Sequence, residues 1–210
     1  MIVLSHRGYW EEVAEKNAPA AFHRSFDLGF GTETDIRDRH GELVIAHDMA
    51  GADAITLDEM LDILGPRDLP LALNIKADGL AAALLAQMRA RGLTQCFTFD
   101  MSVPEMVVQL RLGLPVFTRA SEYEQKPALY EQATGVWLDG FEGEWFCEAD
   151  INGFLQDGKR VAIVSPELHR RDHQPLWAWL RASAVTHNSA LMLCTDLPED
   201  ARMFFGGRAA

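Results

Sequence analysis

The sequence predicts a single-domain α/β protein, a (β/α)8 barrel spanning residues 1–210. Short apolar segments with strand character alternate with helical segments along the chain, and we count about eight such units, the number that closes a barrel. Most strand-like segments end in polar, ionisable residues, as strands do at the catalytic face of a barrel. The length of 210 residues is near the lower limit for this fold, so short loops are expected.

The first half of the chain divides into expected strands and helices. Strands are expected over 2–5, in the two halves of 31–48, and over 69–75 and 95–99; helices are expected over 19–28, 56–64 and 78–91. A polar turn containing His40 and Gly41 joins the two strands within 31–48. Thr56 and Glu59 have the spacing of a capping box, which predicts a helix start at Thr56.

The second half continues the alternation. Helices are expected over 104–112, 127–132, 150–156, 174–183 and 198–205, and strands over 115–118, 135–138, 160–164 and 190–194. Residues 206–210 are expected to form a frayed tail. No linker and no repeat beyond this alternation is visible, so the pattern favours one domain.

Composition narrows the functional classes. A net charge of −12 argues against a general nucleic-acid binder, because a phosphate backbone requires a basic face. Three widely spaced cysteines are expected to be free thiols in a reducing compartment. No signal peptide or membrane-spanning segment is visible, so we expect a cytoplasmic protein without an integral membrane segment. The oligomeric state stays open.

The stretch 31–48 carries the clearest chemical signal. Glu33 and Asp35 are two residues apart in an expected strand, so both carboxylates point to the same face. With an oxygen from Asn74 near the end of a later strand, they would suit Mg²⁺ or Ca²⁺. Alternatively, the two carboxylates form a solvated strand face or pair with nearby arginines.

Further ionisable residues end neighbouring strands. His6 and His47 each follow an apolar segment, and two imidazoles beside a cation are a natural acid and base for displacement at phosphorus. Arg7 and Lys76 could neutralise phosphate oxygens, or pair with the carboxylates instead. The other histidines are expected at the surface, in helices or loops: His23, His40, His169, His173 and His187.

These motifs together resemble the glycerophosphodiester phosphodiesterase family. The match is carried by His6-Arg7-Gly8, Asn17 with Ala20-Ala21-Phe22, Gly31-x-Glu33-x-Asp35, Gly41-x-x-Val44-x-x-His47-Asp48, Phe97-Thr98-Phe99-Asp100 and Thr195-Asp196-Leu197-Pro198. It spans the whole chain and is most specific in the first 48 residues.

The resemblance implies a TIM barrel that hydrolyses small phosphodiesters in lipid metabolism. In that family, the residues matching His6 and His47 act as general acid and base, and those matching Glu33 and Asp35 bind a divalent cation. Those matching Arg7 and Lys76 contact the phosphate. A neighbouring hydroxyl of the substrate is thought to attack phosphorus, with the cation as Lewis acid.

Three departures mark the chain as a divergent member. Asn74 occupies the position of a family glutamate that binds the metal, so Asp139 or Glu167 is a possible replacement ligand. Lys16 and Ala18 stand where the family has Glu and Thr, so the first loop is expected to be arranged differently. The insertion that usually follows His-Asp is short here, so the headgroup pocket is expected to be more open or built from 137–146 and 165–173.

The leading hypothesis is therefore a metal-dependent phosphodiesterase with a small-molecule substrate. A cyclising phosphodiester lyase or phospholipase of the same superfamily is a close alternative. The rival from another class is a barrel that binds a phosphorylated ligand without turning it over, which Asn74 favours and the acid–base pair disfavours.

Overall fold

The computed structural model describes residues 1–206, so the tail predicted for 206–210 lies, apart from Gly206, outside the described residues. The chain divides into two compact units. The N-terminal unit is Ser5–Val116, and the C-terminal unit is Met1–Leu4 together with the residues from Phe117 on. Each unit is an alternation of strands and helices, and the expectation of a single domain stays a prediction. Within residues 1–206, no helix is both long and apolar enough to span a membrane.

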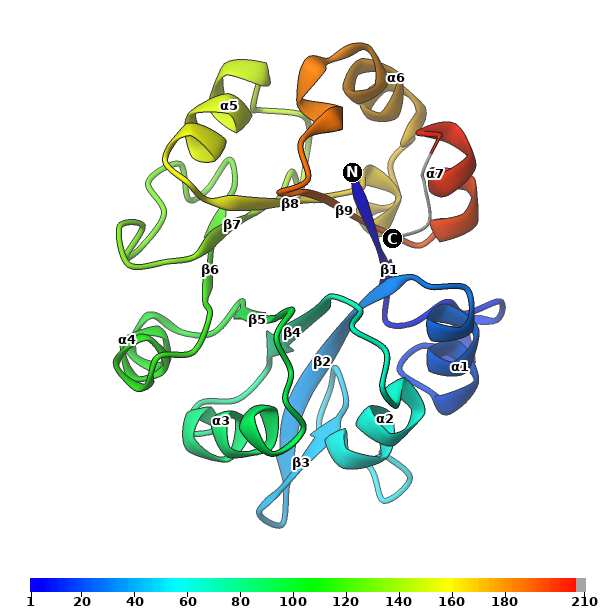
Figure 1. The fold of residues 1–210 in the computed structure, drawn as a ribbon, viewed down its shortest axis with the longest axis vertical. Helices are drawn as coiled ribbons and strands as arrows, with labels where there is room; N and C mark the ends of the chain where they lie inside the picture. The colour runs from blue at the N-terminus through cyan, green and yellow to red at the C-terminus, as the bar shows by residue number, and fades with distance from the viewer. Residues whose placement is uncertain (207–210) are drawn as a thin grey trace. The chain divides into compact units, whose positions relative to one another are not determined.

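The N-terminal unit is a layer of parallel strands covered by helices. Its elements are the end of β1 (Ile2–His6), η1 (Val13–Glu15), α1 (Pro19–Asp27), β2 (Gly31–Arg39), β3 (Glu42–Ile45), α2 (Leu57–Leu64), β4 (Leu71–Ile75), α3 (Ala81–Ala90), β5 (Cys96–Phe99) and α4 (Val103–Leu112). Strand β4 lies between β2 and β5 and is parallel to both. Helices α1 to α4 follow one side of these strands (Figure 1).

Strand β3 does not belong to the parallel set, which corrects the simple strand-then-helix count. It pairs antiparallel with the second half of β2, with Ile36 opposite Ile45 and Arg39 opposite Glu42. The hairpin turn uses His40 and Gly41, both with positive φ, as the polar turn predicted. Because β3 runs backwards along β2, its end returns to the level of Asp35, whose carbonyl accepts a hydrogen bond from Ala46 N at 3.1 Å.

The C-terminal unit repeats the same construction. Its elements after β1 are β6 (Phe117–Ala120), β7 (Gly135–Leu138), α5 (Glu148–Gln156), β8 (Arg160–Val164), η2 (Pro166–His169), α6 (Gln174–Ala182), η3 (Ala184–His187), β9 (Leu191–Thr195) and α7 (Pro198–Phe204). The strands are parallel in the order β9-β8-β7-β6. Apolar side chains of β7, β8 and β9 pack against α5, α6 and α7, with Trp177 at the centre.

One predicted helix, over 127–132, is wrong. The segment forms turns, in which Gln132 N and Ala133 N both donate to the carbonyl of Leu129. Leu129 has a φ of 52°, in the left-handed region, so the right-handed helix cannot continue through it. The other expected helices all form, with ends displaced by a few residues.

Candidate functional site

The site of the N-terminal unit is built on the alternating faces of β2. Glu33 and Asp35 share one face and are buried, at 2% and 0% exposure. On the other face, Thr32 Oγ1 lies 2.6 Å from Ser5 Oγ, and Thr34 donates to the Asn17 amide oxygen at 2.8 Å. The strand is therefore polar on both faces and hydrogen-bonded throughout. The two predicted carboxylates do face the same way, and they are not a solvated face.

A tight turn after β1 brings His6 and Arg7 to these carboxylates. Arg7 has a φ of 60°, and its backbone N–H donates to the Glu33 carbonyl at 2.8 Å. Gly8 follows with a φ of 80°, and a Cβ there would lie 2.8 Å from the Ala21 Cβ. Only glycine fits both the conformation and the close approach to α1. The His-Arg-Gly and Ala-Ala motifs are thus two sides of one packing contact.

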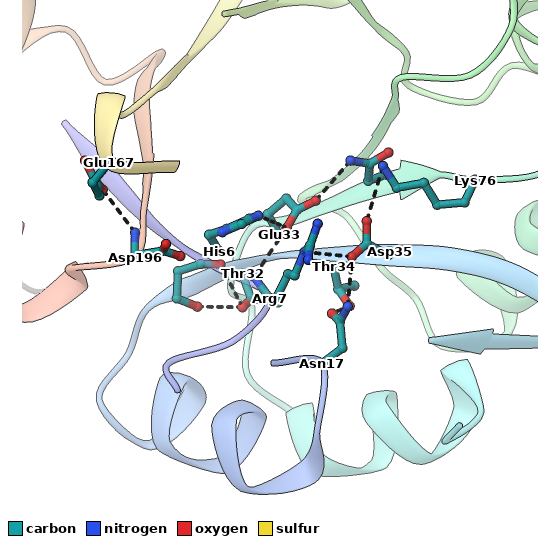
Figure 2. Close-up of polar contacts among 12 residues, drawn as sticks. His6, Arg7, Asn17, Thr32, Glu33, Thr34, Asp35, Lys76, Glu167 and Asp196 are labelled. Carbon is teal, nitrogen blue, oxygen red and sulfur yellow. Dashed lines mark hydrogen bonds and ion pairs between the residues drawn. The ribbon is translucent and has the colours of Figure 1, made fainter. Parts of the chain in front are cut away.

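Asp35 is the centre of the polar cluster (Figure 2). Arg7 Nε lies 3.0 Å from Asp35 Oδ2, and Lys76 Nζ lies 3.4 Å from Asp35 Oδ1. The amide of Asn17 donates to Asp35 Oδ2 at 2.8 Å. The sequence thus identified Arg7, Asp35 and Lys76 as members of one site. The alternative, that Arg7 and Lys76 form ion pairs with the carboxylates, is also observed at Asp35.

Glu33 lies next to His6 and Asn74. Its Oε2 is 3.9 Å from His6 Nε2 and accepts a hydrogen bond from Arg7 N at 3.3 Å. Its Oε1 accepts a hydrogen bond from Asn74 Nδ2 at 3.2 Å. Burial, and next the charge of Asp35, raise the pKa of Glu33 to about 7, opposed by His6, Arg7 and Lys76.

The oxygens on this face allow a test of the predicted cation site. Asn74 lies beside Asp35 in the β2–β4 register; Asn74 Oδ1 is buried without a hydrogen-bond partner, whereas Asp35 Oδ1 faces Lys76 Nζ at 3.4 Å. An amide oxygen without a hydrogen-bond partner beside the Glu33 and Asp35 carboxylates suits a hard divalent cation. Among residues 1–206, no group of three His, Cys, Asp or Glu side chains is placed to hold a metal. The donor set is therefore two carboxylates and one amide, which fits a cation but provides little charge for it.

His47 reaches the region by the β2–β3 hairpin. It follows β3, and Arg37 donates to its carbonyl at 3.2 Å. Its side chain is 46% exposed, and its Nδ1 lies 2.9 Å from Asp48 Oδ1. His47 lines a pocket of about 360 Å³ together with Arg7, Lys16 and Asn17. The structure thus places His47 at the same pocket as Arg7, and places His6 at Glu33.

The two proposed replacement ligands, Asp139 and Glu167, lie in the C-terminal unit. Glu167 Oε1 accepts from Asp196 N at 3.1 Å (Figure 2) and from Thr195 Oγ1 at 2.5 Å, and Glu167 Oε2 accepts from Ser165 Oγ at 2.5 Å. Oε1 therefore links the segment after β8 to the end of β9, and Oε2 makes a local bond within the segment after β8.

Asp139 contacts a histidine that the sequence analysis assigned to the surface. Asp139 Oδ1 lies 2.7 Å from His169 Nε2, whose side chain is only 23% exposed. The His169 ring also packs on Phe141, with centroids 5.0 Å apart. The surface assignment of His169 is wrong, because the fold brings η2 against the loop after β7. No spacing in the sequence indicates this pair.

Asn17 is the residue whose role the sequence did not show. In the sequence, Asn17 stands out only as part of the family motif. In the structure, its side chain donates to Asp35 and accepts from Thr34, and its φ is 61°. Its backbone N–H also donates to the Arg7 carbonyl at 2.9 Å. The signal available in the sequence is an asparagine in a polar loop, because asparagine tolerates the left-handed conformation better than most residues.

Comparison with known proteins identifies structures of the same fold. No protein-family model matches the sequence, and no curated protein sequence matches it. Among solved structures, a protein from Galdieria sulphuraria described as a glycerophosphodiester phosphodiesterase matches with a TM-score of 0.77 and 16% identity, over 98% of each chain. A glycerophosphodiester phosphodiesterase from Agrobacterium tumefaciens matches with a TM-score of 0.75 and 16% identity, over 99% of this chain and 100% of its own.

A third structure, an Oleispira antarctica phosphodiesterase in complex with the product sn-glycerol-3-phosphate, matches with a TM-score of 0.69 and 14% identity. The match covers 99% of this chain and 97% of that one. At such low identity these similarities show the fold. The predicted (β/α)8 barrel is confirmed, and the resemblance inferred from the motifs is confirmed at the level of the fold.

Proposed function

We propose that this chain is a phosphodiesterase that hydrolyses a small glycerophosphodiester-like molecule. One observation carries the proposal: His6, Arg7, Glu33, Asp35 and Lys76 form a single cluster after β1, on β2 and at the end of β4. These are the acid–base, phosphate-binding and anionic groups that phosphodiester cleavage requires. The fold shared with glycerophosphodiester phosphodiesterases, and with a phosphodiesterase that holds the product sn-glycerol-3-phosphate, supports the substrate class.

The cationic side chains are the proposed phosphate-binding groups. Arg7 and Lys76 are 22% and 18% exposed, whereas their partner Asp35 is fully buried. Asp35 thus pairs with both cationic side chains from the buried side, and the exposed parts of Arg7 and Lys76 stay accessible to an anion. Phosphate oxygens are bound well by such guanidinium and ammonium groups.

The two histidines are the proposed general acid and base. His6 is the proposed proton donor, and its Nε2 lies 3.9 Å from Glu33 Oε2, inside the cluster that Arg7 and Lys76 complete. At His47, an Nδ1–H donated to Asp48 would leave Nε2 as a proton acceptor facing the pocket that Arg7 also lines. This assignment would be reversed if His47 protonates the leaving alcohol.

A divalent cation, Mg²⁺ or Ca²⁺, is part of the proposal. Glu33, Asp35 and Asn74 are the residues that would hold it, and the buried amide oxygen of Asn74, which has no hydrogen-bond partner, supports this. Bound there, the cation would supply Lewis-acid stabilisation of charge on the phosphate. We further propose a cytoplasmic role in lipid metabolism, with no nucleic-acid partner.

Turnover of a generic phosphodiester tests the proposal. Purified protein with Mg²⁺ or Ca²⁺ should cleave bis-p-nitrophenyl phosphate, and His6→Ala or His47→Ala should lower kcat/KM by about 100-fold or more. His23→Ala is the matched control, because His23 is exposed on α1 and should leave the rate unchanged. Absence of turnover across a panel of phosphodiesters and both metals would favour the ligand-binding alternative.

Phosphorus NMR of the products distinguishes the two enzymatic alternatives. A hydrolase releases an acyclic phosphomonoester from glycerophosphocholine, whereas a cyclising lyase releases a cyclic phosphate. We expect the acyclic product to accumulate. Persistence of the cyclic phosphate as the final product would assign the chain to the lyase class.

A further inference from the structure

We infer that the phosphate site of the N-terminal unit binds a phosphodiester without a divalent cation, and that a divalent cation binds tightly only once the phosphodiester is present. The inference rests on the proposed function and concerns the balance of positive and negative side chains in the same site. It reverses the usual expectation that the metal creates the anion site.

The first step is the balance of charge in the cluster. Asp35 is paired with both Arg7 and Lys76, at 3.0 and 3.4 Å. Glu33 lies on the same face, and its Oε2 accepts a hydrogen bond from Arg7 N at 3.3 Å. Asn74, within 3.2 Å of Glu33, adds an amide and no charge. At pH 8, the pH of the titrations below, two carboxylates are therefore matched by two cations before any ligand binds.

The second step is the layering of these charges. Glu33 and Asp35 are 2% and 0% exposed, whereas Arg7 and Lys76 keep 22% and 18% of their side chains accessible. Figure 2 shows the Arg7 and Lys76 side chains directed at Asp35 from different sides. An approaching anion meets the cations first, and the carboxylates behind them are already compensated. The phosphate site is therefore complete without a metal.

The third step concerns the cation. A divalent ion at Glu33, Asp35 and Asn74 would lie beside two positive side chains, with no third carboxylate to offset them. A phosphodiester adds one negative charge at that place and lowers the electrostatic cost. By linkage, the phosphodiester must then tighten cation binding by the same factor as the cation tightens phosphodiester binding.

Three NMR titrations at pH 8 test the coupling, using dimethyl phosphate as the diester and Ca²⁺ as the cation. The backbone amide of Arg7, which hydrogen-bonds to Glu33, is a direct reporter. In EDTA, dimethyl phosphate alone should shift this signal. Ca²⁺ alone should bind weakly, and saturating dimethyl phosphate should tighten Ca²⁺ binding by about tenfold or more.

Asn74→Asp is the discriminating variant, because it adds one charge with almost no change of shape. It should tighten binding of Ca²⁺ alone by about tenfold or more and weaken dimethyl phosphate binding in EDTA by a similar factor. Asn188→Asp is the matched control: Asn188 is an exposed turn residue that caps Ala190 N, and aspartate can do the same. It should change neither affinity.

Lys76→Met provides an independent check if Asn74→Asp does not fold. Removing the positive charge of Lys76 makes the cluster more negative by one charge, as Asn74→Asp does. Lys76→Met should therefore also tighten binding of Ca²⁺ alone. The inference is overturned if wild-type protein binds dimethyl phosphate only with Ca²⁺, or if it binds Ca²⁺ alone as tightly as Asn74→Asp. Because every readout is a binding constant, these results stand apart from the turnover assay that tests the proposed function.

Discussion

Two different backbone features position the side chains of the site. Glu33 and Asp35 share a face because strand side chains alternate, and this follows directly from sequence spacing. Arg7 and Asn17 reach Asp35 from left-handed backbone positions, with φ of 60° and 61°. Non-glycine residues adopt that region rarely, so both turns depend on the surrounding contacts that hold them.

Gly8 should be the least replaceable residue of the first turn. Gly8→Ala combines an unfavourable φ of 80° with a Cβ 2.8 Å from the Ala21 Cβ. Gly113→Ala has the same φ of 80° and nothing within 4 Å, so it measures the conformational cost alone. In urea denaturation, we expect a loss of about 1–2 kcal/mol for Gly113→Ala and a further 1–3 kcal/mol, roughly, for Gly8→Ala. Equal losses would show that the contact with Ala21 relaxes freely.

Glu33 should make stability depend on pH. Its pKa is raised from 4.5 to about 7, so between these values the folded state holds a proton that the unfolded state has lost. The free energy of unfolding should therefore fall as pH rises from 4.5 to 7, by up to about 3 kcal/mol. Denaturation in EDTA across this range measures the slope. Glu33→Gln cannot titrate and should lack this component, and an unchanged slope in that variant would locate the titration elsewhere.

At the scale of elements, the hairpin of β2 and β3 matters most for the site. Strand β3 runs antiparallel to β2, so the end of β3 lies at the level of Asp35 in β2. His47, which follows β3, is therefore brought close to Asp35. The sequence predicted both strands and the turn between them. It also predicted His47 at the end of the second strand, beside the expected cation site, whereas the residue-by-residue register of the hairpin comes from the structure.

The start of α2 was predicted from local sequence, and its energetics can be tested directly. Thr56 Oγ1 accepts from Glu59 N at 3.1 Å, and Glu59 Oε2 accepts from Thr56 N at 2.7 Å. Thr56→Ala removes one half of this reciprocal cap and should cost about 1 kcal/mol in thermal or urea unfolding. Thr56→Ser keeps the hydroxyl and should stay within a few tenths of a kcal/mol of the wild type, by the same reasoning. A serine variant as unstable as the alanine variant would contradict a capping role.

At the scale of the whole molecule, the question is whether the two compact units unfold together. The prediction of one domain requires a single cooperative transition. Tryptophan placement allows a test, because Trp10 lies in the N-terminal unit and the other four tryptophans, Trp137, Trp145, Trp177 and Trp179, lie in the C-terminal unit. In Trp10→Phe, tryptophan fluorescence reports the C-terminal unit alone, whereas far-ultraviolet circular dichroism reports both units.

We expect the two probes to give coincident urea transitions in Trp10→Phe, with the same midpoint and slope. Two separated midpoints would show that the units unfold independently. Wild-type protein followed by circular dichroism is the control for any effect of the substitution itself.

The sequence by itself determined the features that depend on local spacing. The shared face of Glu33 and Asp35, the hairpin turn at His40-Gly41 and the Thr56 cap all follow from periodicity or backbone preference within a few residues. The tertiary structure alone decided the pairings: Asp35 with Arg7, Asn17 and Lys76, the amide of Asn74 with Glu33, and Asp139 with His169. It also excluded the helix at 127–132, where Leu129 adopts a left-handed conformation. The physical reason is that periodicity assigns a side chain to a face, whereas its partner comes from a segment that only the fold brings near.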